Sequence, residues 1–187
     1  WVDLATGRLR TPGPFRIHRT FGLHGALGRT AEQDWTRWLA TASLTLGRTG
    51  SDRALSLSGM FGRAEAPEWT GERFALGGAP QLLVDPGVLS QRIDMPALPE
   101  GFLAGEQVWS GKAEVRNEIA SLFYWIGDAE GAAVERQQVI GVEVGGEVPA
   151  IHYVRIPGME LRAGVARLLD EPLQNEWRGW AAVGFRP

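Results

Sequence analysis

Hydrophobic and polar residues alternate along most of this chain, which is the pattern of β-strands that have two unlike faces. Leu161, Ala163 and Val165, for example, alternate with the polar residues Glu160 and Arg162. Turn residues separate the alternating segments about every 12–15 residues, and this spacing suits hairpins. The pattern predicts strands in the segments 15–28, 35–48, 53–64, 107–116, 137–148, 159–168 and 177–187, with shorter strands at 69–77 and 119–127.

Two of these segments are also compatible with helices. Trp35 and Trp38 recur at helical spacing, and so do Ile119, Leu122 and Phe123. We predict strands in both places because the neighbouring segments alternate clearly and the turn residues recur at hairpin spacing.

One long segment, 77–106, lacks the alternation and is rich in glycine and proline. A loop of this length in a compact domain is usually functional or disordered. Four predicted strands precede it within 15–76, and five follow it within 107–187. We therefore expect a single all-β domain over 1–187, made of the first strands, a long loop and five C-terminal strands.

Composition and motifs narrow the class of protein. The chain has no cysteine, which excludes disulfides and thiolate metal sites, and its net charge of −3 argues against a general nucleic-acid binder. His18 and His24 share one predicted strand face, but no acidic residue joins them there to complete a metal site. The sequence contains no HExxH, GxSxG, P-loop or strand-linked GxGxxG motif. We therefore expect a protein that is not an enzyme, without cofactor, metal or nucleic-acid partner.

Charged residues lie on the strand faces opposite the apolar ones, as Lys112, Glu114 and Arg116 do. A soluble barrel or sandwich buries its apolar faces, whereas a membrane barrel turns them to lipid and its charges to the lumen. Small residues such as Gly111 and Ala163 on the apolar faces favour lipid contact, because a protein core needs bulkier filling. The sequence thus predicts an antiparallel transmembrane β-barrel with about nine or ten strands in this chain.

A soluble β-barrel or sandwich that binds an apolar ligand is the alternative. It would place the charged side chains of Glu114 and Arg162 in water. It would also shield four apolar side chains inside, those of Leu44, Phe61, Val115 and Val183.

The end of the chain favours the membrane interpretation. Residues 177–187 alternate and carry Phe185 almost at the end, like the final strand of an outer-membrane β-barrel. Trp109 and Trp177 lie near the ends of their predicted strands, where an aromatic girdle would sit.

Several short motifs follow one another in a characteristic order from residue 73 onwards. They are Arg73-Phe-Ala-Leu-Gly-Gly78 before the long loop, Glu114-Val-Arg116, Leu122-Phe-Tyr-Trp-Ile-Gly-Asp-Ala-Glu-Gly131, Val139-Ile-Gly-Val-Glu-Val-Gly145, Met159-Glu-Leu-Arg-Ala-Gly-Val-Ala166 and Trp180-Ala-Ala-Val-Gly-Phe185. Their order resembles the C-terminal half of the bacterial surface-antigen barrel family, which includes the outer-membrane assembly factors and the two-partner-secretion transporters.

The resemblance implies a location in the bacterial outer membrane. It implies a role in outer-membrane protein assembly or secretion, or as a membrane anchor for an upstream domain. The expected partners are the lipid bilayer and either a protein client or an upstream periplasmic domain.

The family's long loop carries an Arg-Gly-Phe or Arg-Gly-Tyr tip that folds into the lumen, where its arginine meets acidic residues of the following strands. This chain lacks that tip, and the nearest candidate is Arg92. The resemblance implies Glu114 and Asp128 as partners of Arg92, with Arg116 in the same Glu-x-Arg motif as Glu114.

The resemblance also gives the last strand a role. In the family, the final strand pairs with the first strand and carries the signal for membrane insertion; here it contains Trp177, Trp180 and Phe185. The predicted strands are fewer than the family's barrels have, and bacterial barrels usually have an even number. Val2–Arg10 is a candidate for one more strand. We therefore expect this chain to be part of a larger barrel.

Overall fold

The computed structural model describes residues 2–29, 33–66, 73–78, 92–130, 132, 135–147 and 159–185. These residues form an all-β structure of two sheets, and no helix occurs among them. The all-β antiparallel class expected from the alternation is therefore confirmed.

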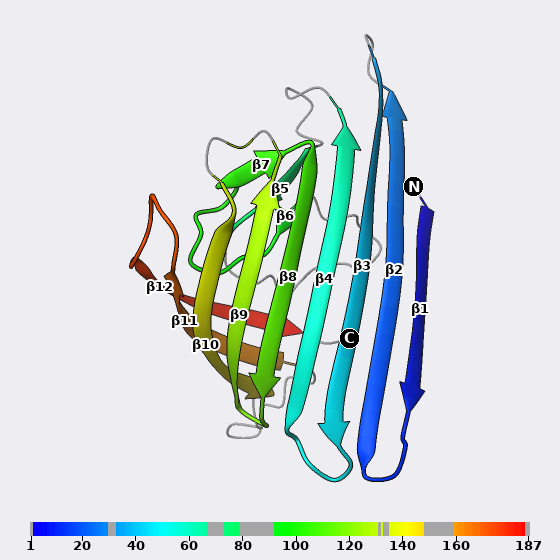
Figure 1. Ribbon diagram of the computed structural model, residues 1–187, viewed down its shortest axis with the longest axis vertical. Helices are drawn as coiled ribbons and strands as arrows, with labels where there is room; N and C mark the ends of the chain where they lie inside the picture. The colour runs from blue at the N-terminus through cyan, green and yellow to red at the C-terminus, as the bar shows by residue number, and fades with distance from the viewer. Residues whose placement is uncertain are drawn as a thin grey trace.

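The larger sheet has nine strands in the order β1-β2-β3-β4-β8-β9-β10-β11-β12, and every neighbouring pair is antiparallel. In Figure 1, β1–β4, β8 and β9 stand side by side, and β10–β12 curl round behind them. The strands are β1 (Val2–Arg10), β2 (Phe15–Arg29), β3 (Asp34–Arg48), β4 (Ala54–Glu65), β8 (Gln107–Arg116), β9 (Ala120–Ala129), β10 (Gln137–Glu147), β11 (Met159–Leu168) and β12 (Trp177–Phe185).

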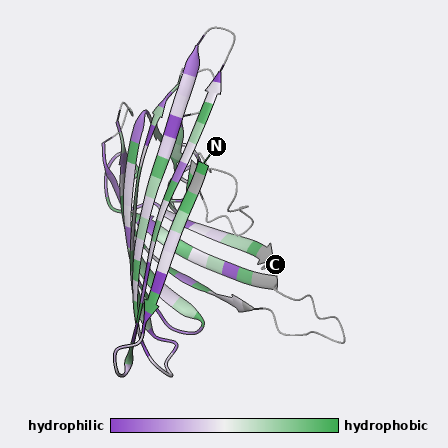
Figure 2. Ribbon diagram, turned by 90° about the vertical axis from the view of Figure 1, so that its right-hand side faces the viewer, coloured by the Kyte–Doolittle hydropathy of each residue, from purple (hydrophilic) through white to green (hydrophobic). Residues whose placement is uncertain are grey.

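The sheet is curved but open. Its edge strands are β1 and β12, and they do not pair with each other in the described structure. Viewed from the side, the C-terminal strands run outward from the plane of the N-terminal strands (Figure 2). The structure therefore gives a curved wall, and the closed cylinder expected from the sequence is not formed by these nine strands alone.

The two segments with helical spacing are strands. The segment 35–48 falls within β3, which pairs along its whole length with β2. The segment 119–127, apart from Ile119, falls within β9, which pairs with β8 and β10. Pairing on both sides satisfies the backbone groups of each strand, so the neighbours decide the structure where the local spacing is ambiguous.

A second, three-stranded sheet lies on the concave side of the wall (Figure 1). It consists of β5 (Phe74–Leu76), β6 (Arg92–Ile93) and β7 (Leu103–Gly105), in the order β6-β5-β7. The expected fourth strand of the barrel, 69–77, thus contributes β5 to this small sheet instead, while Val2–Arg10 supplies an edge strand of the wall. The segment 77–106, expected to be an irregular loop, contains β6 and β7 among its described residues.

The main apolar core of the described residues lies between the small sheet and the concave face of the wall. Phe74, Leu76, Met95 and Leu103 are fully buried from the side of the small sheet. The wall contributes buried side chains from β3, β4 and β8 to β11, namely Leu39, Ala64, Val108, Phe123, Trp125, Ala129, Val139, Ala166 and Leu168.

Two glycines in the wall let the small sheet approach closely. A Cβ on Gly62 would lie 2.8 Å from Cε2 of Phe74, and a Cβ on Gly127 would lie 2.6 Å from Cδ2 of Leu76. Both distances are shorter than carbon atoms tolerate, so Phe74 and Leu76 occupy space that only glycine leaves free.

Candidate functional site

The concave face has an open polar half beyond the core. A cavity of about 590 Å³ lies at the end of the strands near the β8–β9 turn. Its ionisable lining comes from β2, β8, β10 and β11 and the adjoining turns, and includes Arg16, His18, Asp52, Glu114, Arg116, Glu118, Glu143 and Arg162.

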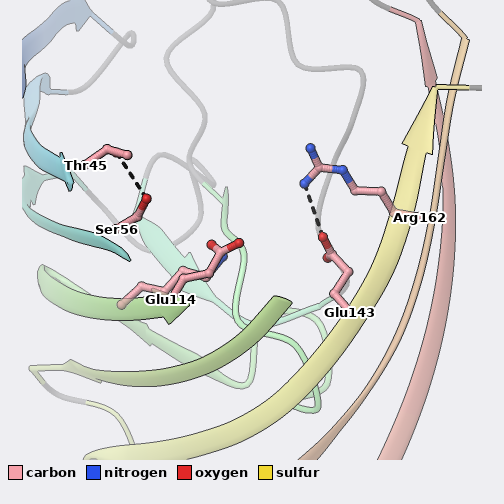
Figure 3. A network of polar contacts seen from close by, with 6 residues as sticks. Thr45, Ser56, Glu114, Glu143 and Arg162 are labelled. Carbon is pink, nitrogen blue, oxygen red and sulfur yellow. Dashed lines mark hydrogen bonds and ion pairs between the residues drawn. The ribbon is translucent and has the colours of Figure 1, made fainter. Parts of the chain in front are cut away.

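Ion pairs hold two of the acidic side chains of this face in place. Lys112 Nζ lies 2.7 Å from Glu114 Oε2. Arg162 Nη1 lies 3.3 Å from Glu143 Oε1, and Figure 3 shows this pair. The Lys112 ammonium also lies over the rings of Phe123 and Trp125, at 5.4 and 5.1 Å from their centroids. Lys112 thus connects the apolar core to the charged cavity.

Hydroxyl groups line the same face on β2, β3 and β4. Thr20 Oγ1 and Ser43 Oγ are 2.6 Å apart, and Thr45 Oγ1 and Ser56 Oγ are 3.1 Å apart. Arg16 donates a hydrogen bond from Nη2 to the carbonyl oxygen of Ser51 at 2.9 Å. The concave face therefore offers water and polar solutes paired charges of both signs together with hydroxyl groups.

Among the described residues, no three His, Asp or Glu side chains are grouped so that they could hold a metal ion. The expectation of a chain without metal or cofactor stays a prediction. His18 lines the cavity together with Arg16, whose guanidinium charge would oppose a bound cation.

The residues that the resemblance assigned to the lumen, Arg92 and its expected partners, lie in three different places. Glu114 and Arg116 line the cavity, with Glu114 paired to Lys112. Asp128 lies on the opposite, convex face. In the β8–β9 register it stands across from Trp109, whereas Glu114 stands across from Phe123 on the concave face. Arg92 begins β6 in the small sheet, and its side chain lies outside the described atoms, so its pairing with either carboxylate stays a prediction.

The aromatic residues of the last strand also divide between the faces. Trp177 stands across from Arg167 on the convex face, and the guanidinium lies 5.7 Å from its ring centroid. Trp180 points to the concave side, where it packs against the core and covers Gly164. Phe185 pairs with Met159 through the backbone, and its side chain lies outside the described atoms.

The convex face is the second candidate surface, because its large apolar side chains are exposed. Hydrophobic and hydrophilic residues alternate along the strands in Figure 2. The strand registers place nearly all the exposed large apolar side chains on the convex side, including Leu4, Phe21, Leu23, Trp38, Leu55, Leu57, Phe61, Trp109, Val115, Leu122, Ile140, Val142, Leu161, Trp177 and Val183.

An aromatic cluster marks one end of this convex face. The ring centroids of Trp38 and Phe61 are 5.3 Å apart, and Phe61 stands across from Trp109 in the β4–β8 register. An ion pair between Arg63 and Glu65, 2.9 Å long, follows directly along β4. The sequence placed Trp109 in an expected aromatic girdle but not Trp38 or Phe61, because only strand pairing brings these three side chains together.

Comparison with known proteins leaves the family open. No family model, no curated protein and no solved structure matches this chain. Within the described residues, no helix is long and apolar enough to cross a membrane.

Proposed function

We propose that this chain forms part of the wall of a β-barrel of the surface-antigen type in the bacterial outer membrane. Its role is in outer-membrane protein assembly or secretion, or as the membrane anchor of an upstream domain. The single observation that carries the proposal is the convex face, which exposes apolar side chains on every strand of the wall.

The distribution of charge supports the same proposal. A membrane barrel has an apolar surface towards lipid and a polar interior. Here Phe61, Val115 and Val183 are 39%, 58% and 48% exposed, while Glu114 and Arg162 belong to the concave face. An exposed apolar surface this extensive is typical of an interaction with a membrane or another protein.

The soluble alternative required the reverse arrangement. It expected these apolar side chains inside a core and Glu114 and Arg162 in bulk water. The main apolar core of the described residues instead lies between the small sheet and one half of the concave face. We therefore keep the membrane function as the proposal.

The lipid-contact proposal is tested by fluorescence quenching with lipids that are brominated in their acyl chains. The protein is reconstituted in vesicles, and the variants Trp109→Phe and Trp125→Phe are compared. Trp109 lies on the convex face and Trp125 is buried on the concave side. We expect Trp109→Phe to lower the fraction of emission that the brominated lipid quenches, and Trp125→Phe to raise it.

Two results would contradict the proposal. One is unchanged emission in brominated vesicles. The other is a chain that stays folded and monomeric in buffer without detergent, since the convex face would then tolerate water.

A further inference from the structure

Four arginines lie together at one end of the convex face. Arg8, Arg10, Arg19 and Arg48 belong to β1, β2 and β3, close to the turns that follow β1 and β3. Arg8 stands directly across from Arg19 in the β1–β2 register. All four side chains are exposed, and we refer to them as the arginine cluster.

The arginine cluster has no acidic counterpart among the described convex-face positions at this end of β1–β4. The nearby Asp52, in the β3–β4 turn, lines the concave cavity instead. The opposite end of the same strands differs, because Arg29 pairs with Asp34 at 3.3 Å and Arg63 pairs with Glu65 at 2.9 Å. Like charges directly across from each other destabilise a sheet, so the Arg8–Arg19 pair favours a bound anion.

The surroundings of the cluster indicate which anion fits. Phe15 stands across from Arg48 and is 58% exposed. Phe21 lies two residues from Arg19 on the same face of β2 and is 50% exposed. Guanidinium groups bind phosphate through two parallel hydrogen bonds. A ligand that satisfies both kinds of side chain carries phosphate beside hydrocarbon, as a lipid does.

We propose that the arginine cluster binds the phosphate groups of anionic lipids at one surface of the bilayer. This rests on the proposed membrane function. It adds which kind of lipid is bound and which end of the wall lies at that surface of the bilayer. A nucleic-acid duplex would satisfy the arginines through its phosphates but would offer no hydrocarbon to Phe15 and Phe21, because its bases are already paired and stacked.

The test compares binding of the full chain to phosphatidylcholine vesicles with and without anionic phosphatidylglycerol, by flotation. The variant Arg8→Gln/Arg19→Gln removes the facing pair from the cluster. The matched control Arg29→Gln/Arg63→Gln removes two positive charges from the opposite end. We expect the cluster variant to lose about 30-fold in partitioning to anionic vesicles, roughly fivefold per arginine, and the control to lose much less.

The outcomes separate the two proposals. Equal partitioning of wild type into both vesicle compositions, or equal losses in both variants, overturns the arginine proposal and leaves the membrane function standing. Failure of wild type to bind either vesicle overturns both. Loss of binding to DNA by the cluster variant, with no vesicle preference in wild type, also overturns the arginine proposal. Circular dichroism checks the fold, and Arg48→Gln replaces the double variant if that variant unfolds.

Discussion

Lys112 and Glu114 are two residues apart on β8, with side chains that meet inside the curve of the wall. Their side chains are only 26% and 18% exposed, so water screens the attraction less than at an open surface. The same spacing occurs in Arg63 and Glu65 on β4, where the side chains are 48% and 61% exposed.

These two pairs give a matched prediction. In double-mutant cycles with alanine, we expect a coupling free energy of about 1–2 kcal/mol for Lys112 and Glu114. For Arg63 and Glu65 we expect about 0–1 kcal/mol, because exposed pairs contribute little. Denaturant unfolding in detergent micelles measures both cycles. Equal coupling energies would mean that the Lys112–Glu114 pair is as well hydrated as the Arg63–Glu65 pair at the end of β4.

Sequence alternation predicts which residues share a face but not which face is convex. It correctly separated Glu114 and Arg162 from Val115 and Val183, since period-two alternation fixes neighbours along one strand. It could not show that Asp128 and Glu114 lie on opposite faces of the sheet, because this depends on the β8–β9 register. Nor could it find the hydroxyl contact between Thr45 and Ser56, which joins two strands.

At the scale of elements, the small sheet depends on a few buried side chains. Phe74 in β5 is fully buried and fills the space above Gly62. We expect Phe74→Ala to cost about 3–5 kcal/mol in the contact between the small sheet and the wall. The small sheet should then open before the wall unfolds, and limited proteolysis should cleave the segment that carries β5–β7 more rapidly.

The control for this prediction is Phe15→Ala, which removes an aromatic ring that is largely exposed on the convex face. Its cleavage pattern should match that of wild type. If Phe74→Ala also left the pattern unchanged, the small sheet would be held by something other than this packing.

The long strands were predictable and the short ones were not. The expected segments 107–116 and 159–168 coincide with β8 and β11, because ten residues show several periods of alternation. In contrast, β6 has two residues and β7 has three, too few to show any period. The place of β5 depends on its contacts with Gly62 and Gly127, and no local pattern records those contacts.

At the scale of the whole molecule, the directions of the two edge strands limit how the wall closes. Nine strands that alternate in direction leave β1 and β12 running the same way. Antiparallel closure therefore needs an odd number of further strands between them, which gives the even total that is usual for bacterial barrels. Direct pairing of β1 with β12 would be parallel.

Spin labels at two cysteine substitutions test this, and the chain has no cysteine of its own to interfere. We expect labels at Thr6 and Ala181 in the reconstituted protein to be more than roughly 10 Å apart, at least two strand spacings. Labels at Thr6 and Phe21, which face each other in the β1–β2 register, should give the short distance of neighbouring strands. Equal distances for the two pairs would indicate direct closure.

The apolar contact layer and the charged cavity lie at opposite ends of the concave face. A barrel built on this wall would be open at one end and closed at the other by the small sheet. Ions and small polar solutes would enter near the β8–β9 turn and contact the paired charges around Glu114 and Arg162. They would leave through the same opening. Passage through the far end would require the small sheet to move away from the wall, so that Phe74 and Leu76 lose their contacts with Gly62 and Gly127.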